Sequence, residues 1–135
     1  MKGILADINA SGPVEDLIRK MQAEPWGEFW RYLGLVHFHF QDVGLSPTSS
    51  DLEIWQKCQA NKLIFITNNR NADSPDSLEI AIRLHNQPDS LPVLTIGNLD
   101  KLRTNREYTE RVLRKLYDYL MRIDNLRGTG RLYLP

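Results

Sequence analysis

Several features that define other protein classes are missing from this sequence of 135 residues. It has a single cysteine, Cys58, so it forms neither an intrachain disulfide nor a cysteine-based zinc site. Its longest uninterrupted apolar run, Leu63 to Ile66, is far too short to cross a bilayer, and the N-terminal apolar stretch is too short for a signal peptide. The glycines form neither of the common phosphate-binding motifs, which disfavours a nucleotide-dependent kinase or dehydrogenase. These absences predict a globular, cytoplasmic protein with no membrane segment.

The chain also has no formal net charge, since 17 basic side chains balance 17 acidic ones. The two signs are nevertheless separated along the chain: residues 1–100 carry 8 basic and 13 acidic side chains, and residues 101–135 carry 9 and 4. Opposite charges lie four residues apart in Glu107 and Arg111, Glu110 and Arg114, and Asp118 and Arg122. Such pairs stabilise a solvated helix surface. The alternative interpretation, an anion-binding face, requires the basic residues to gather on one side.

Short apolar runs alternate with longer amphipathic ones, and the pattern predicts strands and helices in turn. Strands are expected at 2–6, 35–40, 63–67 and 92–96, with a fifth, edge strand at 131–134. Helices are expected to begin near Pro13, after Pro25, at the capping box of Ser50, at Ser74 and near Asn105, the last one running to Leu126. The sequence therefore predicts one domain, 1–135, with right-handed connections. Its fold class is a three-layer α/β/α sandwich with a central, mainly parallel sheet of four to five strands.

Polar residues follow three of the predicted strands. Asp7 follows the first, Asp42 the second, and Asn68, Asn69 and Arg70 the third. The carboxyl ends of parallel strands meet at one edge of a sheet, where ligands of such folds bind, so we expect these side chains to gather there. Carboxylates brought together favour a hard cation such as Mg²⁺, and phosphodiester hydrolysis is the chemistry that follows.

A purely structural interpretation stays open for each acid. Asp7 and Asp42 could only accept hydrogen bonds from loop amides. Asp51 lies in the first turn of a predicted helix, where a negative charge is favoured by the helix dipole.

Four segments resemble, in order and spacing, the short PIN-like proteins, which are relatives of the PIN-domain toxin ribonucleases. The segments are Ile4–Asn9, Phe40–Leu45, Ser50–Trp55 and Leu63–Asn69. The resemblance covers about residues 3–71 and implies a compact α/β/α fold. It also implies RNA cleavage with Mg²⁺ or Mn²⁺ held by acidic residues at the strand ends, and a small antitoxin-type protein as partner.

By this resemblance, Asp7, Asp42 and Asp51 match the family's acidic positions. The match departs from the family at Ile8, where a Glu is usual, and at Asn68, Asn69 and Asn71, where aspartates usually follow the third strand. An amide oxygen ligates a metal without contributing charge, so these changes weaken the site.

The expected metal ligands are therefore Asp7 and Asp42, and Asp73 or Asp76 would have to turn back to complete the set. Asn68 and Asn69 would orient the phosphate or the attacking water, and Arg70 would neutralise phosphate charge.

Other residues offer weaker alternatives. His37 and His39 lie on one face of a predicted strand, an arrangement compatible with a metal, but the remaining histidine, His85, falls in a distant helix. Arg127 and Arg131 flank two glycines and could hold the phosphates of RNA, although a helix stop followed by an edge strand explains the same residues.

Two functional hypotheses result. The first is a PIN-like, divalent-metal-dependent ribonuclease of the toxin-like kind that the resemblance implies. The alternative is a PIN-like module that has lost catalysis and binds RNA or a protein. A small α/β enzyme of another lineage and a homo-oligomer both stay open.

Overall fold

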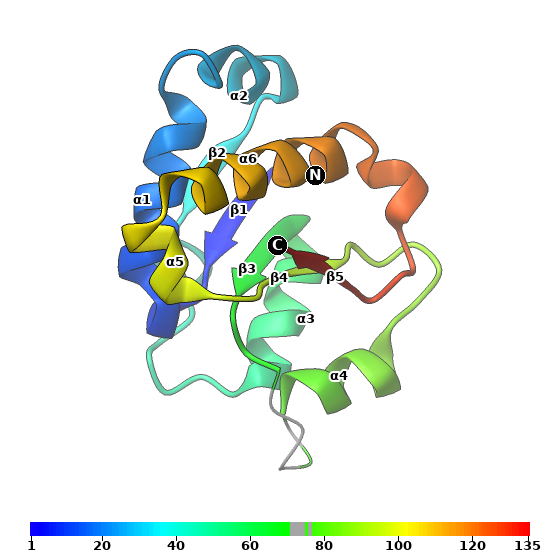
Figure 1. Cartoon of the computed structure of the whole chain (residues 1–135). Helices are drawn as coiled ribbons and strands as arrows, with labels where there is room; N and C mark the ends of the chain where they lie inside the picture. Colours follow the sequence, from blue (N-terminus) through cyan, green and yellow to red (C-terminus); the bar gives the residue numbers. More distant parts are fainter. Residues whose placement is uncertain (71–74, 76) are drawn as a thin grey trace.

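The computed structural model describes residues 1–70, 75 and 77–135 (Figure 1). At its centre lies a five-stranded sheet in the order β2-β1-β3-β4-β5, and every neighbouring pair of strands is parallel. The strands are β1 (Gly3–Ala6), β2 (Val36–Phe38), β3 (Leu63–Thr67), β4 (Val93–Ile96) and β5 (Arg131–Leu134). The predicted α/β class and parallel sheet are confirmed, with β2 and β5 at the two edges.

Helices cover both faces of the sheet (Figure 1). The elements are α1 (Ser11–Gln22), α2 (Gly27–Leu33), α3 (Asp51–Asn61), α4 (Leu78–His85), α5 (Leu99–Thr104) and α6 (Arg106–Met121), with short 3-10 turns η1 (Ile8–Ala10), η2 (Phe40–Val43) and η3 (Ile123–Leu126). One face packs against α1, α5 and α6, and the other against α3 and α4. The arrangement is the three-layer sandwich expected from the sequence.

The central strands are apolar on both faces because both faces are buried. In β3, Ile64 and Ile66 point to the layer of α1 and α6, whereas Leu63 and Phe65 point to the layer of α3 and α4. All five residues of this strand are buried. The continuous apolar run that predicted a strand covered on both sides is thus explained.

The ends of several helices follow local capping rules. The Ser50 hydroxyl oxygen accepts a hydrogen bond from the backbone N–H of Glu53, and the Glu53 carboxylate accepts one from the backbone N–H of Ser50, as the predicted capping box requires. Asn105 caps α6 through the N–H of Tyr108. The helix predicted over 105–126 is shorter than expected, because the backbone tightens after Met121 into the turn η3. Of the three charge pairs predicted on it, the structure forms Asp118–Arg122.

The last connection departs from the right-handed rule. The chain passes from β3 to β4 over the face of α4, and then moves on in the same direction to β5 over the opposite face, through α5 and α6. These two connections therefore have opposite hands, and the first three share one hand. Since α3 and α4 already cover one face, α6 buries its apolar stripe on the other, where it completes the layer begun by α1.

The strand order reverses beside β1. From β1 the chain first passes outward to β2 and then crosses to β3 on the other side of β1. A reversal of this kind leaves a crevice outside the carboxyl ends of the two strands, here β1 and β3. Asp7 directly follows β1, and Asn68 directly follows β3.

Among the described residues, no helix is both long and apolar enough to cross a membrane.

Candidate functional site at the carboxyl edge of the sheet

Asp7 lies where β1 ends and is held by β3. Its side chain is only 5% exposed. Thr67, the last residue of β3, donates its hydroxyl hydrogen to Asp7 Oδ2 over 2.6 Å, and the backbone N–H of Asn9 donates to Oδ1 over 3.0 Å. The backbone N–H of Asp7 donates to the carbonyl of Ile66. The carboxylate predicted to lead the site is therefore buried at the point where the strand order reverses.

The same hydrogen-bond chain continues to α3. The backbone N–H of Asn69 donates to Thr67 Oγ1 over 2.9 Å, and its side-chain amide donates to Asp51 Oδ2 over 3.1 Å. The same Asp51 oxygen accepts the N–H of Leu78, the first residue of α4, over 3.0 Å. We call Asp7, Thr67, Asn69 and Asp51 the edge network. It joins residues from three separate segments, as the strand-end rule predicted for Asp7 and Asn69.

Arg131 supports the edge network from β5. Its side chain is 6% exposed. One terminal nitrogen donates to the backbone carbonyl of Asn69 over 2.7 Å and to Thr95 Oγ1 over 2.6 Å, and Nε donates to Glu79 Oε2 over 3.1 Å. This arginine was expected to bind substrate phosphates. In the structure its Nε and one terminal nitrogen donate to the protein itself, and these hydrogen bonds hold the loop that carries Asn69 against β4 and α4.

Other predicted site residues lie apart from the edge network. Asp42 is half exposed in η2 and accepts the backbone N–H of His39 over 2.8 Å. Asn68 and Arg70 are exposed at the carboxyl end of β3. Asp73, with Asn71 and Asp76, lies outside the described residues.

Arg127 occupies the opposite end of the sheet, because the segment before a parallel strand lies at its amino edge. It lines a cavity of about 340 Å³ together with Lys62, which precedes β3. Its guanidinium donates to Asp124 Oδ1 and to the carbonyl of Asp89, each over 3.0 Å. The predicted joint action of Arg127 and Arg131 on one RNA strand has no support from this arrangement.

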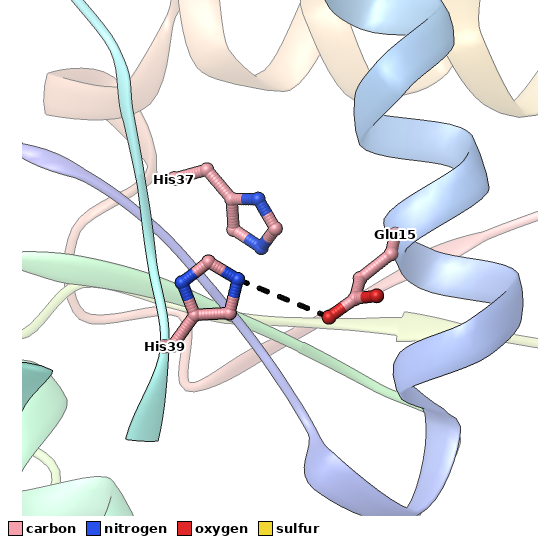
Figure 2. A group of neighbouring side chains, drawn as sticks. All are labelled: Glu15, His37 and His39. Carbon is pink, nitrogen blue, oxygen red and sulfur yellow. Dashed lines mark ion pairs between the residues drawn. The ribbon is translucent and has the colours of Figure 1, made fainter. Parts of the chain in front are cut away.

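A second polar group lies between β1 and β2 at the same carboxyl edge. Figure 2 shows Glu15 of α1 facing His37 of β2 and His39, which follows that strand. We call these three residues the histidine group. One oxygen or nitrogen from each lies within 4.8 Å of the others. They line a cavity of about 160 Å³, next to Ala6 and Ile8 at the end of β1.

The two imidazoles of the histidine group are close neighbours. Their ring centroids are 4.4 Å apart, and His39 Nε2 lies 3.9 Å from Glu15 Oε1. His37 Nε2 is buried, and none of the described residues forms a hydrogen bond with it. Burial, with a smaller contribution from the charge of His39, lowers the pKa of His37. The ring of His37 is therefore neutral at pH 7, with ring nitrogens able to act as ligands.

Sequence reasoning found the two histidines of this group and missed its third member. The remaining histidine of the sequence, His85, packs instead against Trp55 in the other helical layer. Glu15 lies in the second turn of α1, and α1 belongs to the connection from β1 to β2. Residues in the first turns of such a helix lie near the carboxyl edge of the sheet, close to the end of β2. This position in the topology is the signal that could have identified Glu15.

The donor sets of the two groups suit different cations. The edge network offers carboxylate, hydroxyl and amide oxygens, which fit Mg²⁺ or Mn²⁺, and a magnesium site commonly uses only one or two protein carboxylates. Within the described residues, Asp7, Asp42 and Asp51 do not form a group of three convergent ligands, whereas Glu15, His37 and His39 do. No family model, curated protein or solved structure matches this chain.

Proposed function

We propose that this chain is a PIN-like endoribonuclease that depends on Mg²⁺ or Mn²⁺ and acts at the edge network. The observation that carries the proposal is the hydrogen-bond chain from Asp7 through Thr67 and Asn69 to Asp51. It gathers two carboxylates from distant segments at the reversal of strand order, where α/β folds bind their ligands. The resemblance of the four segments to PIN-like proteins adds RNA as the substrate.

The proposed roles follow from position and remaining hydrogen-bonding capacity. Asp7 holds the cation directly or through water, since an ionised carboxylate with two donors still has free lone pairs. Asp51 and Asp42 are the next carboxylates that could serve as metal ligands. Asp73 remains a candidate ligand on the basis of the sequence alone. When bound, the cation would acidify a water molecule and neutralise charge on phosphorus.

Residues after β3 would handle the substrate. Asn68 and Arg70 are exposed there, so they reach a phosphate group without leaving any contact inside the protein. Asn69 acts differently: its amide donates to Asp51 and its carbonyl accepts from Arg131, so it positions the loop and the carboxylate.

The hydrogen bonds of the three aspartates favour a second, non-catalytic function. Asp7, Asp42 and Asp51 each accept hydrogen bonds from the protein's own backbone N–H groups, which a purely structural role explains. Under this alternative the chain is a PIN-like module without catalysis that binds RNA or a small antitoxin-type protein.

The two functions are separated by a cleavage assay on single-stranded RNA with Mg²⁺ or Mn²⁺, run beside an RNA-binding measurement. The parent is expected to cleave. The variants Asp7→Asn and Asp51→Asn are expected to lose at least about a hundredfold in rate. The matched control is Asp89→Asn, which changes an exposed aspartate near the amino edge and is expected to cleave as the parent does.

Each outcome has a clear meaning when circular dichroism establishes that the variants fold. Binding of RNA without cleavage, unchanged in Asp7→Asn, supports the non-catalytic module. Cleavage that persists in both edge-network variants contradicts the proposed site. Neither binding nor cleavage of RNA contradicts RNA as the ligand under both hypotheses.

A further inference from the structure

The ligand atoms of the histidine group lie close to the distances that a bound metal ion requires. Glu15 lies on α1, His37 on the edge strand β2 and His39 directly after that strand, so their backbones are fixed by the fold. Ligand nitrogens around one tetrahedral zinc ion lie about 3.4 Å apart, given bond lengths of about 2.0–2.1 Å. The present separations are all within 4.8 Å, so each exceeds that value by about 1.4 Å at most.

The internal contacts of the group do not account for its arrangement. The separation of 3.9 Å between His39 Nε2 and Glu15 Oε1 is too long for a hydrogen bond, and both side chains are partly exposed, so this pair contributes little stability. His37 Nε2 is buried and has no partner among the residues that the structure describes. A buried nitrogen of this kind is unfavourable unless a ligand or a water molecule satisfies it.

Asp42 gives His39 a defined orientation. Its Oδ2 lies 3.4 Å from His39 Nδ1 and accepts the backbone N–H of the same residue over 2.8 Å. With Nδ1 directed to Asp42, Nε2 is left facing Glu15 (Figure 2). A carboxylate behind one ring nitrogen, with the metal at the other, is a recurrent arrangement at histidine metal sites.

We infer that Glu15, His37 and His39 bind a divalent transition-metal cation of the zinc type, with Asp42 as a positioning residue for His39. Two imidazole nitrogens and one carboxylate oxygen suit Zn²⁺ or Co²⁺, whereas Mg²⁺ prefers an all-oxygen set. The cavity of about 160 Å³ beside these residues leaves room for a water molecule as the fourth ligand. The three ligands of this inference, Glu15, His37 and His39, have no role in the proposed ribonuclease activity.

The experiment titrates Zn²⁺ into the metal-free full chain by calorimetry and repeats the titration with Co²⁺, whose visible absorption reports coordination geometry. We expect one saturable site of micromolar affinity or tighter and a Co²⁺ spectrum with nitrogen ligands in tetrahedral geometry. His37→Gln and Glu15→Gln are expected to weaken binding by more than about a hundredfold. Asp42→Asn is expected to weaken it about 10–100-fold, the range for a group that orients a ligand.

The control variants keep the test specific. His85→Gln removes the third histidine, which lies exposed in α4, and is expected to bind zinc as the parent does. Asp7→Asn is expected to do the same, so loss of RNA cleavage and loss of zinc binding are distinguishable. Histidine-ring NMR signals reveal whether Co²⁺ broadens His37 and His39 and leaves His85 sharp, even if one ligand variant fails to fold.

Three results would overturn the inference. One is the absence of saturable Zn²⁺ binding at micromolar concentrations. Another is equal weakening by His37→Gln and His85→Gln, which indicates adventitious surface binding. The third is displacement of Zn²⁺ by Mg²⁺ at similar concentrations, because it contradicts a nitrogen-containing ligand set.

Discussion

Two polar groups lie at the same edge of the sheet, and they use their hydrogen-bonding capacity in opposite ways. In the edge network, the carboxylates of Asp7 and Asp51 accept two hydrogen bonds each from nearby protein donors. In the histidine group, His37 Nε2 has no hydrogen-bond partner in the described part of the chain, and the distance between His39 and Glu15 is too long for a hydrogen bond. The first group is satisfied internally, whereas the second is not.

This difference separates stability from ligand binding. Buried carboxylates that accept hydrogen bonds hold the segments which donate them, so the edge network fixes the loops after β1 and β3 in place. A buried polar atom left without a partner destabilises the folded state and is available to a ligand. We therefore expect mutations in the edge network to lower the free energy of unfolding more than mutations in the histidine group do.

The largest expected effect concerns Arg131, which anchors the edge network. Arg131→Met removes the donors to Asn69, Thr95 and Glu79 and leaves the partly buried carboxylate of Glu79 with only the more distant Arg83, 3.9 Å away, as a basic partner. Because Glu79 retains some exposure, we expect the lower end of the range for a broken buried pair, a loss of about 3 kcal/mol in the free energy of unfolding. Urea denaturation of both proteins measures it.

The matched control for this variant is Arg127→Met at the amino edge, where the arginine pairs with a mostly exposed aspartate, Asp124. Its expected loss is below about 1 kcal/mol. Equal losses in the two variants would mean that the hydrogen bonds of Arg131 contribute no more than a surface ion pair does.

Asp7→Ala is expected to have the next largest effect. It leaves the hydroxyl of Thr67 and the N–H of Asn9 without their acceptor at a position that is only 5% exposed. We expect the free energy of unfolding to fall by about 2 kcal/mol. A double-mutant cycle with Thr67→Val isolates the contribution of the 2.6 Å hydrogen bond, and additive effects would show that the two side chains are not coupled.

Zinc should make the histidine group, and not the edge network, the source of additional stability. If zinc binds the histidine group, a free concentration about ten times the Kd raises the free energy of unfolding by about 1.4 kcal/mol, because only the folded chain presents the site. Thermal unfolding with and without Zn²⁺ measures this gain. The gain is expected to vanish in His37→Gln and to persist in Asp7→Asn; the opposite pattern would assign the metal to the edge network.

The fold was predictable because its signals are local. The continuous apolar run of Leu63–Thr67 requires cover on both faces, and the capping box of Ser50 and Glu53 marks a helix start without reference to the rest of the chain. The six-residue helix α5 was not predicted, since its length gives too little periodicity to detect. The opposite hand of the last connection depends on which face was still uncovered, and no local pattern encodes that.

The candidate site was only partly predictable, for a related reason. The strand-end rule correctly predicted that Asp7 and Asn69 lie together, because strand ends are fixed by topology. Side-chain direction decides the rest. Asp42 turns back to His39, Arg131 extends along the sheet to Thr95, and Glu15 faces β2 from a helix. A sequence alone does not specify those directions.

The smallest expected effect is a dependence of stability on pH that belongs to the histidine group. Burial and His39 lower the pKa of His37 in the folded chain, while the nearby charges of Glu15 and Asp42 oppose this shift and Arg19 adds to it. The unfolded chain therefore binds a proton at this ring more readily, near pH 6.5. Stability from the neutral ring is present above that pH and is lost as the pH falls through the lower pKa of the folded chain.

In metal-free protein, thermal unfolding between pH 7.5 and pH 5 should show a steeper loss of stability in the parent than in His37→Gln. Identical slopes would mean that His37 is no less solvated than an exposed histidine, and the contrast between the two groups would then rest on hydrogen bonding alone.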